Sequence, residues 1–198
     1  MRGVCVLLSF LVLVLTSFSL SVGSEPSYKS TYVGQEKREI KSLSEQDIEE
    51  LKKGSGWGLA KAAELNGLPG PKHILEMKKE IGLTSDQEKQ IENVYESMNR
   101  QAVKLGHELI ELERELNNHF ANKTINEKVL RNLLDKIATT YRELRFVHLS
   151  AHLRTPDILR KAQIEQYNKL RGYDTDDPCV NIPEGHDPEM WKKHHRCP

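Results

Sequence analysis

The chain has 198 residues, with 29 Lys and Arg against 29 Asp and Glu, and only 6% of its residues are aromatic. Because charges of both signs are interleaved and cancel, no strong field is available to attract nucleic acid, which excludes a broad electrostatic nucleic-acid binder. Leu, Glu, Lys, Arg and Ala dominate while Gly and Pro are few, and this composition favours an all-α protein with long helices.

Residues 1–23 are typical of a secretory signal peptide. Arg2 gives a basic start, residues 4–20 are almost wholly apolar, and residues 21–23 supply small side chains for cleavage. The alternative is a retained anchor helix, because the apolar run is just long enough to span a bilayer. With cleavage, the chain is exported and has no other membrane segment.

Residues 24–70 are predicted to form an N-terminal extension with short helices. The first part is polar and aperiodic. Ser42 and Glu45 then have the spacing of a capping box, which predicts a short helix over residues 42–53. Residues 59–65 have helical composition and predict a second short helix.

Two prolines mark the boundary of the main domain, predicted over residues 71–173. Pro69 and Pro71 cannot lie inside a helix, so this stretch is an ordered turn. Pro71 suits the first turn of a helix, which we expect to run to Ile81 and to end at Gly82.

The strongest helical periodicity follows. Thr84 and Gln87 have capping-box spacing and predict the start of a helix that ends near Phe120. At 1.5 Å per residue this helix is about 55 Å long. Its apolar residues alternate steps of four and three, the pattern of a heptad seam. They are Ile91, Tyr95, Met98, Ala102, Leu105, Leu109, Leu112 and Leu116.

A second long helix repeats this pattern. Thr124 and Glu127 predict its start, after a turn around Asn122. Its seam is predicted at Leu130, Leu134, Ile137, Tyr141, Leu144, His148 and Ala151. Two matched seams joined by a short turn predict an antiparallel helical hairpin. Because one hairpin leaves apolar faces uncovered, they must pack against its own flanking helices or a second copy, and we expect a homodimer.

The hairpin should end at residues 155–157, where Pro156 breaks the helix. A final helix follows, with one broad face formed by Leu159, Ala162, Gln163, Ile164, Tyr167 and Leu170. The remaining tail, residues 174–198, contains Cys179 and Cys197. In an exported chain these two cysteines are expected to form a disulfide.

A zinc site is the alternative for the tail. His186, His194 and His195 lie within the loop that the two cysteines bound, so imidazoles and sulfurs could surround one Zn²⁺ ion. The spacing matches no standard zinc module.

A metal site is also conceivable in the hairpin. His148 and His152 are four residues apart, a spacing that presents two imidazoles on one helix face. The predicted turn would place Glu96 and Glu92 opposite them, with Met98 as the nearest seam residue. Imidazole, carboxylate and thioether ligands suit Zn²⁺, Cu²⁺, Ni²⁺ or Co²⁺. The alternative is that His148 is an ordinary core residue and that the carboxylates form a solvated helix face.

An enzyme is not expected. The chain contains no nucleophile motif, no HExxH zinc-protease motif and no phosphate-binding loop. The His and carboxylate groups lie along rods that imply no deep pocket.

An LTxxQ motif stands at the start of the first long helix, where Leu83, Thr84 and Gln87 are its defining residues. A degenerate second copy before the final helix retains Leu159 and Gln163. Together with the leader and the hairpin, these residues make the chain resemble the periplasmic LTxxQ family. This family comprises the Spy/CpxP chaperones and their zinc-resistance and nickel/cobalt-sensor relatives.

The resemblance implies a four-helix, mostly α homodimer with a shallow cradle in the periplasm. Chaperone-like members bind unfolded envelope proteins without ATP, or act with a sensor or regulator protein in envelope stress. The alternative that the resemblance implies is a heavy-metal-binding sensor or resistance protein. For that role His148, His152 and Met98 are the matching residue types.

Overall fold

The computed structural model describes residues 28–173, 178–179 and 182–197, so the predicted signal segment lies outside the described residues. Residues 1–33 and 34–198 belong to two separate units. The described residues form helices and no strand, which confirms the all-α class. Among these residues, no helix has the length and apolar character needed to cross a membrane.

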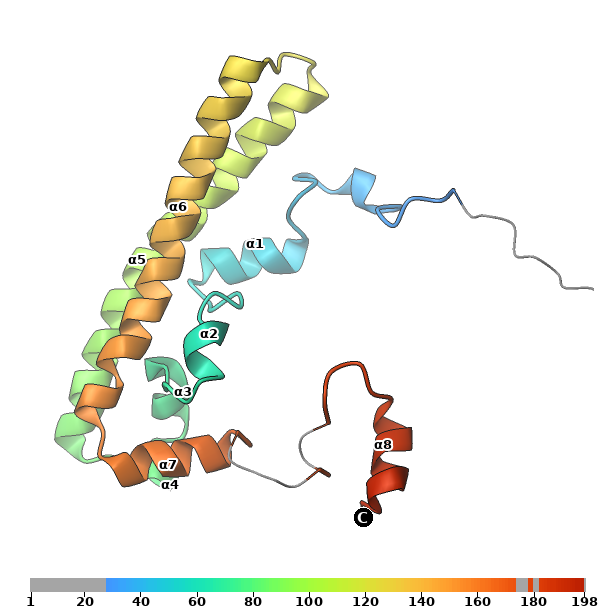
Figure 1. Cartoon of the computed structure of the whole chain (residues 1–198). Coiled ribbons are helices and arrows are strands. Elements are labelled where there is room, and N and C mark those ends of the chain that lie inside the picture. The colour runs from blue at the N-terminus through green and yellow to red at the C-terminus, as the bar shows by residue number, and fades with distance from the viewer. Residues whose placement is uncertain (1–27, 174–177, 180–181, 198) are drawn as a thin grey trace, which may run out of the picture. The chain divides into compact units, whose positions relative to one another are not determined.

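Figure 1 shows the helices in chain order. A 3-10 turn at Gln35–Lys37 is followed by α1 (Glu45–Lys52), α2 (Lys61–Glu64), α3 (Pro71–Glu76), α4 (Lys78–Ile81), α5 (Ser85–Ala121), α6 (Glu127–Arg154), a 3-10 turn at Pro156–Ile158, α7 (Lys161–Leu170) and α8 (Pro188–His195).

The predicted hairpin is formed by α5 and α6, which lie side by side over most of their length (Figure 1). Helix α5 begins as predicted, because the Thr84 side chain accepts from the Gln87 backbone N–H and Gln87 bonds back to the Thr84 N–H. The predicted seam residues Ile91, Met98 and Ala102 are buried, as is Leu109.

The turn of the hairpin differs from the prediction. Helix α5 continues to Ala121, and Asn126, not Thr124, caps α6 by accepting from the Val129 N–H at 3.0 Å. Asn is at least as good an N-cap as Thr. The Thr124 hydroxyl instead lies 2.9 Å from Nδ1 of His119 at the end of α5.

The later turn changes the register of the hairpin. Thr140 donates to Glu108 at 3.0 Å, whereas a turn around Asn122 would have placed it opposite Lys104. Before Val147 the buried side chains of α6 are therefore Leu133, Thr140 and Leu144. The predicted seam residues Leu134 and Tyr141 are 47% and 39% exposed, which corrects that part of the seam. Thr140 is tolerated at the interface because its hydroxyl has a partner.

The short helices of the N-terminal extension pack on the hairpin, with α1 against α5 and α2 against α6. The cap of α1 is Ser44 with Asp47, not Ser42 with Glu45 as predicted. Ser44 has the extended backbone that an N-cap needs. The Ser42 hydroxyl donates to Glu113 of α5 at 2.7 Å, so a tertiary contact uses it.

Helix α1 approaches α5 closely at Gly106. A Cβ added there would lie 2.3 Å from the backbone oxygen of Leu51, a distance that no real Cβ contact allows. The approach brings Leu51 into the core with Ile40, Leu43 and Leu109. The glycine is thus required by packing, since an α-helix interior otherwise disfavours it.

We expect Gly106→Ala to lower the free energy of unfolding by roughly 1–2 kcal/mol, because the cost of overpacking exceeds the gain in helix propensity. Urea denaturation followed by circular dichroism measures the change. The control is Gly56→Ala, where the added Cβ meets no atom within 4 Å. A Gly106→Ala variant as stable as the parent would show that α1 is held less closely than described.

The helix predicted over residues 71–81 is interrupted at Met77, whose φ of −108° and ψ of 22° separate α3 from α4. It begins at Pro71 and ends at Gly82 as predicted, with Gly82 in the left-handed region at φ 68°. This region suits glycine because it has no Cβ.

The two leucines of the LTxxQ copies, Leu83 and Leu159, pack against one apolar cluster. Leu83 directly follows the end of α4, where its N–H donates to the Lys78 backbone oxygen at 3.0 Å, and its side chain is half-buried. The buried members of the cluster come from α3, α4, α5 and α7, and they are Ile74, Ile81, Ile91 and Tyr167. Leu83 is thus a packing residue at the base of the hairpin.

The two motif glutamines meet. Gln87 Nε2 donates to Gln163 Oε1 at 2.9 Å, and Gln163 Nε2 donates to the Gly82 backbone oxygen at 2.9 Å. These bonds join the start of α5 to the start of α7. On α7, Gln163 and Tyr167 are buried, while the predicted face residues Ala162 and Leu170 are exposed, because α7 packs through a narrower face than predicted.

Candidate functional site

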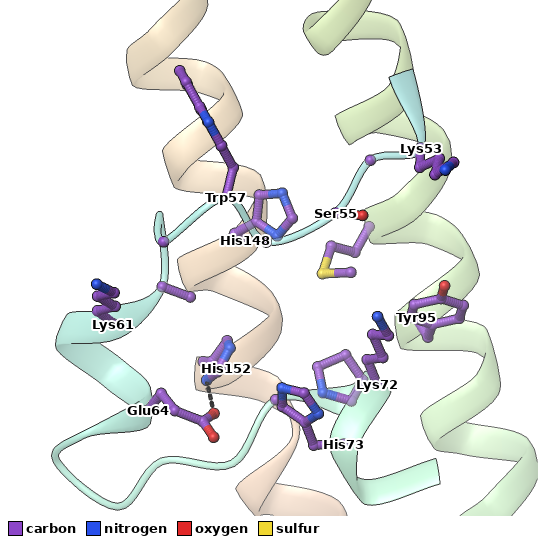
Figure 2. Close-up of a pocket in the computed structure, with 17 residues that line it drawn as sticks. Lys53, Ser55, Trp57, Lys61, Glu64, Lys72, His73, Tyr95, His148 and His152 are labelled. Carbon is purple, nitrogen blue, oxygen red and sulfur yellow. Dashed lines mark ion pairs between the residues drawn. The ribbon is translucent and has the colours of Figure 1, made fainter. Parts of the chain in front are cut away.

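A cavity of about 280 Å³ lies between the N-terminal extension and the hairpin (Figure 2). The extension supplies the Gly-rich loop after α1 (residues 54–58), helix α2 and the turn before α3, and the first residues of α3 complete this side of the cavity. The hairpin supplies two side chains from each long helix. The hairpin residues are Tyr95, Met98, His148 and His152.

The structure brings three of the predicted metal ligands to this cavity. His148 and His152 are 3% and 8% exposed and line it together with Met98. Glu92 and Glu96 do not line it. Both carboxylates lie on the exposed face of α5, where Glu96 pairs with Arg100, because they fall outside the seam that α5 buries through Ile91, Met98 and Ala102.

The residues of the two LTxxQ copies also lie outside the cavity lining. They pack or hydrogen-bond among the ends of α4, α5 and α7, as described above, and so have a structural role in this chain. These residues are Leu83, Thr84, Gln87, Leu159 and Gln163.

His148 has an unusual environment. Its Nε2 atom is buried and has no hydrogen-bond partner among the described residues. Burial, and to a smaller degree the neighbouring His152, lower the pKa of His148 to about 4. The imidazole is therefore neutral at neutral pH. A buried polar atom without a partner costs free energy, and in a cavity wall it marks a position where a ligand could supply the partner.

His152 is held by the turn that precedes α3. Its Nδ1 lies 2.8 Å from the Leu68 backbone oxygen, so Nδ1 carries the proton and Nε2 is the acceptor in the neutral ring. The Nε2 side of the ring packs on Gly70, where an added Cβ would lie 2.5 Å from Nε2. Only glycine fits at this position, which explains why the turn between Pro69 and Pro71 contains Gly70.

Glu64 is the acidic residue of the cavity lining, and its side chain is only 12% exposed. Its Oε1 accepts from the Tyr167 hydroxyl at 2.5 Å and from Arg171 Nε at 3.1 Å. The Tyr173 hydroxyl also donates to it, at 3.0 Å. Burial and then the bond to Glu64 raise the pKa of Tyr167 far above its ordinary value. The Glu64 Oε2 atom lies 4.0 Å from His152 Nδ1.

Three lysines surround the cavity from three segments: Lys53 follows α1, Lys61 begins α2 and Lys72 lies in α3 (Figure 2). Lys53 has Glu49 at 3.3 Å and Lys72 has Glu76 at 3.9 Å. For Lys61 the described part of the chain shows no ion pair. The Glu64 charge is balanced by Arg171, and Lys53 and Lys72 have their own acidic partners, so Lys61 leaves net positive charge beside the cavity.

Sequence reasoning missed Glu64, the lysines and His73, which also lines the cavity. Single charged residues in a highly charged chain give no local signal. The signal that could have found the site is the Gly-rich segment around Trp57 together with the proline-glycine turn, because both predict backbone that approaches another element closely.

Among residues 28–173, 178–179 and 182–197, no group of three or more His, Cys, Asp and Glu side chains is placed to hold a metal ion. Metal binding by His148, His152 and Met98 thus stays a prediction. Their arrangement offers two imidazoles and one thioether, and one of these imidazoles already bonds to the backbone.

In the tail, Cys179 and Cys197 form the predicted disulfide, with an S–S distance of 2.09 Å. Their sulfurs are therefore not thiolate ligands for zinc. The tail histidines lie near Trp191, whose ring centre is 4.6 Å from that of His186 and 4.2 Å from that of His195. His194 packs against His195.

Comparison with known proteins returns no match to a protein-family model, to a curated protein or to a solved structure.

Proposed function

We propose that the chain is an exported periplasmic protein that binds unfolded clients without ATP, as a Spy/CpxP-like chaperone or envelope-stress regulator. The proposal rests first on the large apolar side chains that α6 leaves exposed. Phe146 and Leu153 are 63% and 64% exposed, although the opposite face of the same helix packs in the core through Leu144 and Ala151.

These two residues are seven positions apart, so they lie on the same face of α6, two turns from each other. Leu134 and Tyr141 add exposed apolar surface closer to the hairpin turn. Arginines such as Arg142 and Arg145 lie between them on the helix and are exposed. Apolar side chains separated by solvated charges favour brief contacts with many unfolded sequences, because no single partner covers the surface permanently.

Two further observations support export and an ATP-independent activity. The disulfide is a bond that forms and persists in oxidising compartments such as the periplasm. The sequence contains no phosphate-binding loop. The homodimer that the resemblance implies stays a prediction.

The test of client binding replaces exposed apolar residues of α6 by charged ones. We expect the parent protein at stoichiometric amounts, without nucleotide, to suppress light scattering from a reduced, aggregating test protein. The double variant Phe146→Asp/Leu153→Asp should lose most of this suppression, because burial of each apolar side chain by the client is worth about 1.5–3 kcal/mol. Circular dichroism should show an unchanged helix content, since both residues are exposed.

The matched control is Asn132→Asp/Thr139→Asp, which adds the same charge at two exposed polar positions of α6 with the same spacing. This variant should retain the suppression. No suppression by the parent at several-fold excess, or equal loss in both double variants, would contradict the proposal.

A second candidate is a periplasmic heavy-metal sensor or resistance protein. It is favoured by one observation, the joint position of His148, His152 and Met98 in one cavity wall. The surrounding lysines oppose a cation there, so we place this function second. Titration with Zn²⁺, Ni²⁺, Co²⁺ and Cu²⁺ is part of the experiment that follows.

A further inference from the structure

The cavity beside the hairpin has features of a small-molecule site that client binding does not use. The exposed face of α6 that carries Phe146 and Leu153 does not line it. The cavity of about 280 Å³ is close to the lower end of the range for ligand pockets, which is about 300 Å³. It could hold a compound of one ring with one or two substituents.

The lining suggests which chemistry fits. Trp57, Tyr95, Met98 and Pro71 contribute apolar groups. His148 contributes a buried Nε2 atom without a partner, and its side chain is 3% exposed. Ligand sites combine such an apolar wall with a few polar groups that fix the orientation of the ligand.

The charge around the cavity indicates which ligands fit it best. Lys53, Lys61 and Lys72 lie on different sides of it in Figure 2. Because Arg171 and two tyrosine hydroxyls already bond to Glu64, the one carboxylate of the lining does not offset these lysines. An anionic group near Lys61 gains a partner that this lysine otherwise lacks within the described residues.

We infer that the cavity binds a small organic acid with a ring or similar apolar body, whose carboxylate faces the lysines and whose second polar group hydrogen-bonds to His148 Nε2 after a small shift of the imidazole exposes that atom to the cavity. The inference is independent of client binding, and a protein that fails as a chaperone could still bind such an acid.

Three probes separate the two polar contacts. 4-Hydroxybenzoate has both groups, benzoate lacks the hydroxyl, and 4-hydroxybenzyl alcohol lacks the charge. We expect 4-hydroxybenzoate to bind with a dissociation constant on the order of millimolar or lower, and each of the others several-fold more weakly. Binding is measured on the full chain by fluorescence of Trp57, in a Trp191→Phe background that removes the other tryptophan, and by ligand-observed NMR.

Two variants assign the contacts. Lys61→Gln, at an exposed position, should weaken 4-hydroxybenzoate roughly threefold and leave 4-hydroxybenzyl alcohol unchanged. His148→Phe should reduce the roughly fivefold preference for 4-hydroxybenzoate over benzoate to near unity. The control for the lysine is Lys128→Gln, an exposed residue near the hairpin turn that does not line the cavity.

The Lys61→Gln variant keeps the test decisive even if His148→Phe does not fold. The inference is overturned if no probe binds at about ten millimolar, a concentration well above the expected dissociation constant, or if the uncharged alcohol binds as well as the acid. It is also overturned if Lys61→Gln and Lys128→Gln behave alike. Stoichiometric binding of Zn²⁺, Ni²⁺, Co²⁺ or Cu²⁺ that His148→Ala abolishes, with no binding of any acid, would assign the cavity to the metal function.

Discussion

Acidification from pH 7 to pH 4 should destabilise the protein by up to about 3 kcal/mol through His148 alone. Burial holds the pKa of this histidine near 4, against 6.5 for the exposed side chain. Between these two values the unfolded chain binds the proton and the folded protein does not. The contribution of His148 to stability is thus complete above about pH 6.5 and is lost as the pH falls toward 4.

Urea denaturation at several pH values, followed by circular dichroism, measures this loss. Other groups of the cavity also face His148, among them His152, Glu64 and His73, so the informative quantity is the difference between the parent and His148→Phe. The free energy of unfolding of the variant should depend less steeply on pH, whatever its value at pH 7. The exposed His107 provides the control, and His107→Phe should retain the steep dependence. Parallel curves for the parent and His148→Phe would mean that His148 takes up its proton equally readily in the folded and the unfolded protein.

Replacing Glu64 by Ala should lower the free energy of unfolding by about 2–3 kcal/mol, because it leaves one buried donor, the Tyr167 hydroxyl, and the half-buried charge of Arg171 without their partner. Tyr167 is fully buried and donates its hydroxyl to this carboxylate, and the Arg171 guanidinium loses its counter-ion. The loss should separate α2 from α7, since Glu64 ends α2 and both partners lie in or directly after α7. Chemical denaturation measures the effect.

The control is Glu165→Ala on α7, an exposed carboxylate that pairs with Lys161 at 3.7 Å. It should cost no more than about 0.5 kcal/mol. In the background of Tyr167→Phe, which removes one of the donors, Glu64→Ala should cost less than in the parent, and the difference reports the coupling. Equal effects of Glu64→Ala and Glu165→Ala would rule out a structural role for the buried carboxylate.

Several features follow from the sequence because they depend on neighbouring residues. The capping box of Thr84 and Gln87 satisfies backbone groups within one turn, so its spacing alone predicts the start of α5. Gly82 ends α4 for an equally local reason, since it adopts a left-handed conformation. The two long apolar repeats predict two helices that pair, because each must bury its apolar stripe. The two cysteines that lie outside the predicted leader predict a disulfide between them, and the structure confirms it.

Other features depend on which residues the hairpin brings together. Ser42 and Thr124 have the right spacing for caps, but Ser42 bonds to Glu113 and Thr124 to His119, while Ser44 and Asn126 cap the helices. The position of the turn sets which residues of α5 and α6 lie level with each other, but Glu92 and Glu96 lie outside the buried seam of α5. They therefore face solvent wherever the turn falls.

The candidate site shows most clearly which features follow from the sequence and which depend on the tertiary structure. The sequence alone determined that His148 and His152 share one helix face, because a spacing of four residues does so in any α-helix. Only the tertiary structure decided what lies beside that face: the Gly-rich loop and Glu64 of the extension, together with lysines from the extension and from α3. Their positions depend on close backbone contacts at Gly70 and Gly106, each with a group that is distant along the chain. Such contacts between distant segments have no local pattern, because they arise from the packing of complete helices.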